Sequence, residues 1–157
     1  MSYKEQLQRI ANDYLGSAER KTARARDIAG WAIRQGRWQP QPADLIDQCA
    51  RQIADAMREE YITDPQGRRV RAKHSAIIPD GEGEQFAFWA DMRTAPREYM
   101  EVAFQQRRQH IVAECRQLKS DVESYNENIN QGEPIQMVFD FRHDLEEGEI
   151  VRKRPAA

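Results

Sequence analysis

YITDPQGRRVRAKH, residues 61–74, contains the strongest local signal for structure in this chain. Asp64, Pro65 and Gly67 occupy the first, second and fourth positions of a type I turn, and strand-forming residues lie on both sides of it. This pattern predicts a β-hairpin. Because side chains alternate between the two faces of a strand, the second strand should present three cations on one face. These cations are Arg69, Arg71 and Lys73.

Two further stretches alternate as strands do. Residues 85–92 and residues 135–141 place apolar side chains at every second position. Together with residues 60–63 and 68–78 they predict a small antiparallel sheet. The run that begins at Gln136 is also similar to the short peptides by which bacterial proteins dock on the replication sliding clamp, although strand pairing with residues 85–92 explains the same pattern.

Helical periodicity flanks these strands, and Gly16, Gly36 and Gly132 follow three of the four predicted helices. The predicted helices span residues 2–15, 18–35, 42–60 and 94–130. Residues 144–157 lack apolar periodicity and predict a loose tail. The chain is therefore expected to be α+β: a helical N-terminal part with a basic β-hairpin and a small antiparallel sheet, followed by one long C-terminal helix.

The long helix contains a heptad pattern, in which apolar residues step by four and three positions. Arg108 occupies one seam position, where a polar residue often sets register or partner. The pattern predicts a coiled-coil homodimer, or alternatively a long helix that packs on its own domain. The apolar seam residues are Phe104, Ile111, Cys115, Leu118, Val122, Tyr125 and Ile129.

Composition limits the function classes. The 157 residues include 24 basic and 26 acidic residues, and the net charge is −2. Counting along the sequence, residues 1–80 contain 14 Lys and Arg against 11 Asp and Glu, whereas residues 81–157 contain 10 against 15. Neither a membrane span nor an apolar signal core is found. Cys49 and Cys115 lie in helical patterns, so we expect a cytoplasmic protein with reduced thiols.

Motifs for catalysis and metal binding are not found in the sequence. The three histidines, His74, His110 and His143, are scattered and form no ligand set with cysteine. Neither a Gly-x-Ser-x-Gly nucleophile motif nor a phosphate-binding glycine loop is found. We therefore expect no catalytic residues, no metal, no cofactor and no small-molecule ligand.

Helices followed by a basic hairpin, over residues 20–75, resemble a winged helix-turn-helix domain. The resemblance implies that the hairpin lies along a DNA backbone, where its cations neutralise phosphates. The helix before the hairpin departs from the pattern because it is acidic, which makes the cationic residues 20–37 a stronger candidate for DNA contact. The candidate nucleic-acid-binding residues are Arg20, Lys21, Arg24, Arg68, Arg69, Arg71 and Lys73.

These features predict a small, dimeric, non-enzymatic DNA-binding or regulatory protein that uses its basic hairpin on the phosphate backbone. The alternative is an assembly adaptor that binds protein through the long helix, with the hairpin only a solvated edge. We expect three parts: a winged-helix-like domain over residues 1–92, the long helix over 93–132, and a short strand with a flexible charged tail over 133–157.

Overall fold

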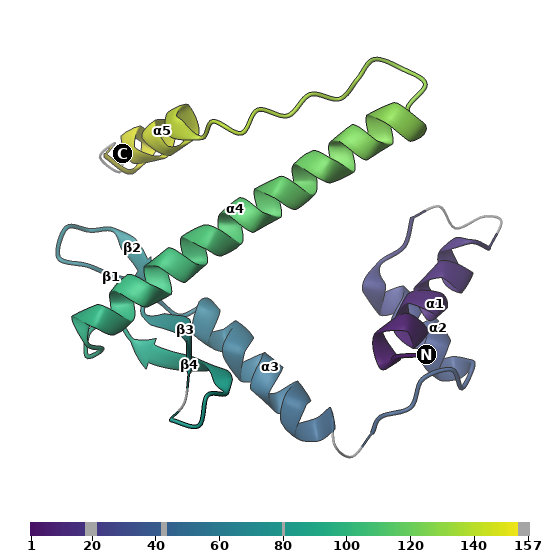
Figure 1. Ribbon diagram of the computed structural model, residues 1–157, viewed down its shortest axis with the longest axis horizontal. Helices are drawn as coiled ribbons and strands as arrows, with labels where there is room; N and C mark the ends of the chain where they lie inside the picture. The colour runs from purple at the N-terminus through teal and green to yellow at the C-terminus, as the bar shows by residue number, and fades with distance from the viewer. Residues whose placement is uncertain (18–21, 42–43, 80, 154–157) are drawn as a thin grey trace. The chain divides into compact units, whose positions relative to one another are not determined.

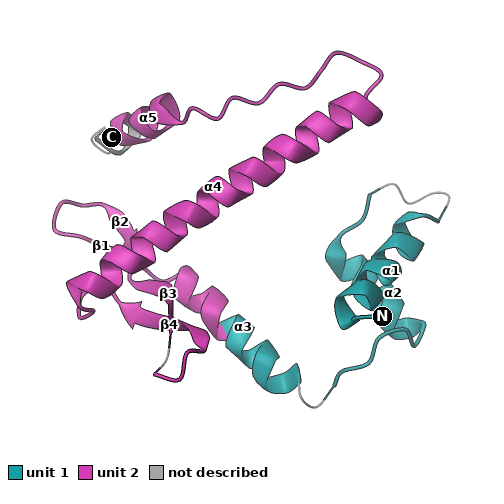
Figure 2. Cartoon of the chain, viewed as in Figure 1, with its two compact units in different colours: residues 1–52 teal, residues 53–157 magenta. Residues whose placement is uncertain are grey.

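The computed structural model describes residues 1–17, 22–41, 44–79 and 81–153. The chain divides into two units, residues 1–52 and residues 53–157 (Figure 2). Helices and two small antiparallel sheets follow one another along the chain (Figure 1), which confirms the predicted α+β class. Within the described residues, no helix is long and apolar enough to cross a membrane.

The first unit begins with helix α1 (Tyr3–Leu15), close to the predicted range. The Ser2 hydroxyl accepts a hydrogen bond from the Glu5 amide, and the Glu5 carboxylate accepts one from the Ser2 amide. This reciprocal capping box satisfies two amides that the first helical turn leaves unbonded. Gly16 ends the helix as predicted, and its amide bonds the Asn12 carbonyl.

Helix α2 (Ala25–Arg34) is shorter than the predicted helix over residues 18–35. Residues 22–24 are not helical, because Arg24 has an extended backbone and its guanidinium binds Asp27 in the first turn. The predicted start at residues 18–21 lies outside the described residues. Gly36 follows the helix with φ of 66°, a conformation that glycine adopts without strain.

Aromatic side chains join α1 to α2. The Tyr14 and Trp31 rings meet edge to face with centroids 5.4 Å apart. The Trp38 indole N–H donates to the Tyr3 hydroxyl at 2.8 Å, so the chain after α2 returns to α1. Ile10 is buried in this small core.

Helix α3 (Asp44–Arg58) has the amphipathic pattern that the sequence indicated. Its predicted start at Pro42 lies outside the described residues. None of the α3 side chains is buried, and Leu45, Ile46 and Ile53 are exposed.

The predicted hairpin is confirmed. Strands β1 (Tyr61–Thr63) and β2 (Arg69–Arg71) pair antiparallel across the turn. The Asp64 carboxylate accepts hydrogen bonds from the backbone amides of Gln66 and Arg68, at 3.0 and 2.8 Å, and so fixes the turn. Gly67 has φ of 83° and occupies the left-handed position.

The second hairpin strand does not continue unbroken through residues 68–78, which corrects the prediction. Ala72 separates β2 from strand β3 (Lys73–Pro79), and β3 pairs instead with strand β4 (Gln85–Asp91). Ala72 is fully buried, its amide bonds Glu60, and its carbonyl accepts from Met92. The bond to Glu60 continues the β1–β2 register by one residue, and the bond from Met92 precedes the β3–β4 ladder, so Ala72 lies where the chain passes from one two-stranded sheet to the other.

Helix α4 (Arg97–Asn128) is the predicted long helix, and its first three turns pack on β3. Met100 and Ala103 are buried there. The Tyr99 hydroxyl lies 2.8 Å from the His74 carbonyl and 2.7 Å from the Phe88 carbonyl, on neighbouring strands. The core of the second unit is therefore the interface between the start of α4 and the β3–β4 sheet.

Two C-terminal predictions were wrong. Residues 135–141 are all described and form no strand pairing. The supposed loose tail forms helix α5 (Arg142–Lys153). Asp140 accepts a hydrogen bond from the Arg142 amide and binds the Arg142 guanidinium, which stabilises the start of this helix.

Candidate nucleic-acid interface

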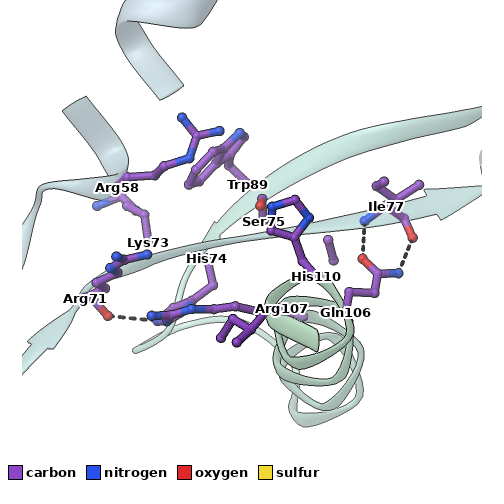
Figure 3. A pocket seen from close by; sticks show the side chains of 13 residues that line it. Arg58, Arg71, Lys73, His74, Ser75, Ile77, Trp89, Gln106, Arg107 and His110 are labelled. Carbon is purple, nitrogen blue, oxygen red and sulfur yellow. Dashed lines mark hydrogen bonds between the residues drawn. The ribbon is translucent and has the colours of Figure 1, made fainter. Parts of the chain in front are cut away.

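A pocket of about 650 Å³ lies where β2, β3 and β4 meet the first half of α4 and the last residue of α3 (Figure 3). None of the residues that line it is acidic. Its cationic, imidazole and aromatic walls come from elements far apart in the sequence. The residues used below are Arg58, Arg71, Lys73, His74, Trp89 and Arg107.

One face of the hairpin leads into this pocket. Tyr61 and Arg71 are cross-strand partners, so their side chains share a face, and Arg69 lies on the same face of β2. The Arg69 guanidinium lies over the Tyr61 ring, with its central carbon 4.1 Å from the ring centroid. The cation–π contact holds Arg69 in place, and none of the described carboxylates forms an ion pair with its guanidinium.

Arg71 and Arg107 enter the pocket from β2 and α4 respectively. Neither guanidinium has a carboxylate partner among the described residues. Desolvation lowers the pKa of Arg107 below its ordinary value, and the positive charge of Arg71 lowers it further. Tyr61 opposes this shift. Two guanidinium groups thus repel each other in a pocket whose lining residues include no Asp or Glu, an arrangement that an anion would stabilise.

His74 binds the backbone of Arg71 beside this pair of arginines. Its Nε2 lies 2.8 Å from the Arg71 carbonyl, which can only accept, so Nε2 bears the proton in this bond. Its ring meets the Phe104 ring edge to face, 5.2 Å between centroids. Burial lowers the pKa of His74. The bond to the Arg71 carbonyl opposes this shift, and the positive charges of Arg107 and Arg71 add to it. The imidazole is therefore a neutral structural group at neutral pH.

Gln106 sets the position of Arg107. Its side-chain amide accepts from the Ile77 amide at 2.7 Å and donates to the Ile77 carbonyl at 2.9 Å (Figure 3). The amide thus replaces a neighbouring strand at the edge of β3. This two-point contact holds the adjacent Arg107 at the pocket wall.

Trp89 supplies an aromatic wall. It projects from β4 into the pocket and is partly buried. The Arg58 guanidinium lies over the Trp89 ring, 5.4 Å from the centroid (Figure 3). The same guanidinium also binds Asp55 at 2.7 Å. A flat surface beside cations is a combination that binds nucleobases as well as phosphates.

The other predicted cations lie next to carboxylates. The Arg68 guanidinium binds Asp64 at 2.7 Å, and the Arg24 guanidinium makes two bonds of 2.9 Å to Asp27. Lys73 binds Glu60 at 2.8 Å and Asp91 at 3.3 Å. Arg20 and Lys21 lie outside the described residues. Of the predicted set, the structure places Arg69, Arg71 and Lys73 in or beside the pocket.

The sequence reasoning did not select Arg58, Trp89 or Arg107. A signal for Arg107 was present, since Met100, Ala103 and Arg107 follow at steps of three and four and therefore share one face of α4. An arginine that continues a buried apolar stripe is placed at the edge of a core, where it is partly desolvated. No local pattern indicated Arg58 or Trp89, because their contact depends on how α3 and β4 meet.

The chemistry available at this site is anion binding. Guanidinium groups bind phosphate through parallel N–H donors, which suits Arg71 and Arg107. Among the described residues, no group of three or more His, Cys, Asp or Glu side chains could hold a metal ion. Comparison of the chain with protein-family models, with curated proteins and with solved structures gives no match.

Proposed function

We propose that the protein binds nucleic acid without catalysing a reaction, and that phosphates lie against Arg69, Arg71 and Arg107. The observation that supports this most strongly is the pair Arg71 and Arg107, which share a pocket without any acidic lining residue. A bound phosphate would offset the repulsion between these guanidinium groups and release counterions from the nucleic acid. This proposal keeps the hairpin as the basic element and adds α4 to it.

Trp89 extends the proposal from the backbone to the bases. Stacking of one base on an aromatic side chain contributes about 1–3 kcal/mol and tolerates any base. Such stacking needs an unpaired or displaced base, so the Trp89 wall favours single-stranded segments or ends over intact duplex. Arg58 would move from the Trp89 ring or stack on the opposite face of the base.

The proposal includes a homodimer and a cytoplasmic location. Ile111, Leu118 and Tyr125 of the predicted seam are exposed on α4, and Ile129 is exposed directly after it, which supports a partner helix there. The cytoplasmic location is proposed from the two cysteines of the sequence, which lie in α3 and α4 rather than in a closely spaced disulfide framework. A dimer would present two arginine pockets to one nucleic acid.

Fluorescence anisotropy tests the proposal directly. Labelled random single strands and duplexes are titrated at about 50 and about 200 mM salt, with the wild-type chain and with Arg71→Gln/Arg107→Gln. We expect binding that weakens with salt, at least about a tenfold loss in the double variant, and tighter binding of the single strand. Absence of binding at low salt contradicts the proposal.

The adaptor alternative is supported by a different observation, the exposed apolar side chains of α3 and α4. In that case the partner would be bound through apolar contact, and association would be insensitive to salt. Sedimentation of the wild type and of Leu118→Asp, at low and high salt, separates the two. Salt-insensitive association without nucleic-acid binding favours the adaptor.

A further inference from the structure

Two strand-like segments of the second unit lack a partner among the described residues. One is the outer edge of β4, since β4 pairs only with β3. The other is the segment of residues 135–141, which alternates as a strand but forms no strand pairing with any described residue. The two segments have equal length, and both expose apolar side chains, with Met137 50% exposed and Phe86 47% exposed.

The backbone groups of both segments point outward. Ile77 directs its amide and carbonyl to Gln106, so the Ile77–Ala87 pair is a non-hydrogen-bonded pair. The amide and carbonyl of Ala87 therefore point to the open edge of β4. An exposed row of such groups is a template for another strand.

The second segment is held in place by a similar device. The Asn126 side-chain amide accepts from the Ile135 amide at 3.0 Å and donates to the Ile135 carbonyl at 2.8 Å. Backbone groups of successive residues in an extended chain point to opposite sides. Those of Gln136, Val138 and Asp140 therefore point away from α4 and are available to a partner.

The two segments of one chain cannot pair while these contacts hold. Asn126 follows Gln106 by twenty residues, which is about 30 Å along α4 and nearly the opposite face of the helix. Residues 135–141 span only about 20 Å when fully extended. A chain anchored at Asn126 cannot lay this segment along a sheet that is anchored at Gln106.

We propose that residues 135–141 pair with the outer edge of β4 in a second copy of the chain. Because each copy has both a free edge and a free strand, two copies can exchange them reciprocally and close the assembly. The commitment to a second copy rests on this complementarity within one sequence. The inference does not depend on nucleic-acid binding.

The side chains fit this arrangement. Phe86 and Phe88 lie on one face of β4 and are about half exposed. Residues 135, 137, 139 and 141 are apolar and share one face of the added strand. With that face beside the two phenylalanines, the added strand extends the apolar layer under α4. Asp140 then lies on the opposite, solvent-facing side.

Two proline variants and their mixture test the exchange. Ala87→Pro removes only an edge amide, because Ala87 does not bond β3, and edge prolines are tolerated in sheets. Val138→Pro blocks the donated strand, and Val138→Ile is its matched control. Sedimentation velocity across the micromolar range measures association, and circular dichroism checks the fold of each variant.

We expect the wild type and Val138→Ile to dimerise and each proline variant to associate at least about tenfold more weakly. An equimolar mixture of the two proline variants should form a heterodimer, since one chain retains the strand and the other the edge. In the wild type, amide hydrogen exchange at Ala87 and Val138 should slow as protein concentration rises. This last measurement requires no variant.

A wild-type chain that stays monomeric, and whose Ala87 and Val138 amides exchange at a concentration-independent rate, contradicts the inference. The same result would be obtained if residues 135–141 instead bound a different protein. Proline variants that dimerise as the wild type does contradict it too, because the seam of α4 would then suffice. Well-folded proline variants that fail to complement each other in the mixture also contradict it.

Discussion

The tip and the base of the hairpin use arginine in opposite ways. At the tip, Arg68 binds the carboxylate of Asp64, which also fixes the turn. At the base, Arg71 and Arg107 share a pocket without acidic lining residues. A count of cations along the sequence treats these positions alike. The charge available to a ligand therefore depends on which carboxylates the fold places beside each cation.

Arg107→Glu makes the base resemble the tip and should have the largest effect. The new carboxylate would bind Arg71, so nucleic-acid affinity should fall about a hundredfold through loss of two phosphate contacts. The melting temperature should rise, because a repulsion becomes an ion pair. Anisotropy and thermal unfolding measure the two effects. Arg97→Glu, at the first residue of α4 and outside the pocket lining, makes the same change of charge and should affect binding less.

Gln106→Met disturbs the support of the base and leaves the tip intact. It removes both hydrogen bonds to the Ile77 backbone, which should lower the free energy of unfolding by about 1–3 kcal/mol. Urea unfolding measures this loss. Gln105→Met, one position earlier and exposed, is the control. Equal stability of the two variants would contradict the role assigned to Gln106.

His74 makes the stability of the base depend on pH. Its pKa is lowered in the folded state, so between that value and about 6.5 the unfolded chain binds more protons than the folded chain. Stability is therefore complete above about pH 6.5 and falls as the pH drops below it, by at most about 1.4 kcal/mol per pH unit for one proton. Urea unfolding at successive pH values should show this slope.

His74→Gln should flatten the pH dependence, whereas the exposed His143 replaced by Gln should preserve it. A slope that is unchanged in His74→Gln would assign the proton to another group. The pKa of Asp91, which Arg93 and Lys73 hold well below its usual range, affects stability only at more acidic pH, below the ordinary carboxyl range.

Asp64→Ala makes the tip resemble the base and should have the smallest effect on binding. Freed from its carboxylate, Arg68 becomes available to phosphate, so affinity should rise by a few-fold. The same change removes the bonds that fix the turn, so the melting temperature should fall by a few degrees. Asp64→Asn separates the effects, since its amide oxygen can keep the turn bonds. A decrease in affinity for both variants would show that the turn itself, rather than Arg68, matters for binding.

Local elements were predictable where neighbouring residues determine them. The turn at Asp64 to Gly67 and the long helix follow from turn chemistry and helical periodicity, and both formed. The strand predicted over residues 135–141 did not form, because alternation specifies a strand but not its partner. The tether at Asn126 keeps this segment away from its own sheet.

The candidate site was predictable only in part. Arg69 and Arg71 follow from the hairpin register, since alternation places them on one face. Arg107 and Trp89 join them through tertiary packing of α4 and the β3–β4 sheet, which no local pattern contains. Lys73 forms ion pairs with Glu60 and Asp91, which are distant from it in the sequence, so no local pattern indicated that its charge is neutralised.

The most direct test of the central claim compares Arg71→Gln with Arg68→Gln, which remove the same charge from the same hairpin. The logarithm of the affinity for a labelled single strand is measured against the logarithm of salt concentration. We predict that Arg71→Gln lowers the magnitude of the slope by about 1 and weakens binding, while Arg68→Gln leaves both nearly unchanged. Equal effects of the two variants would contradict the account, because any cation on the hairpin would then serve.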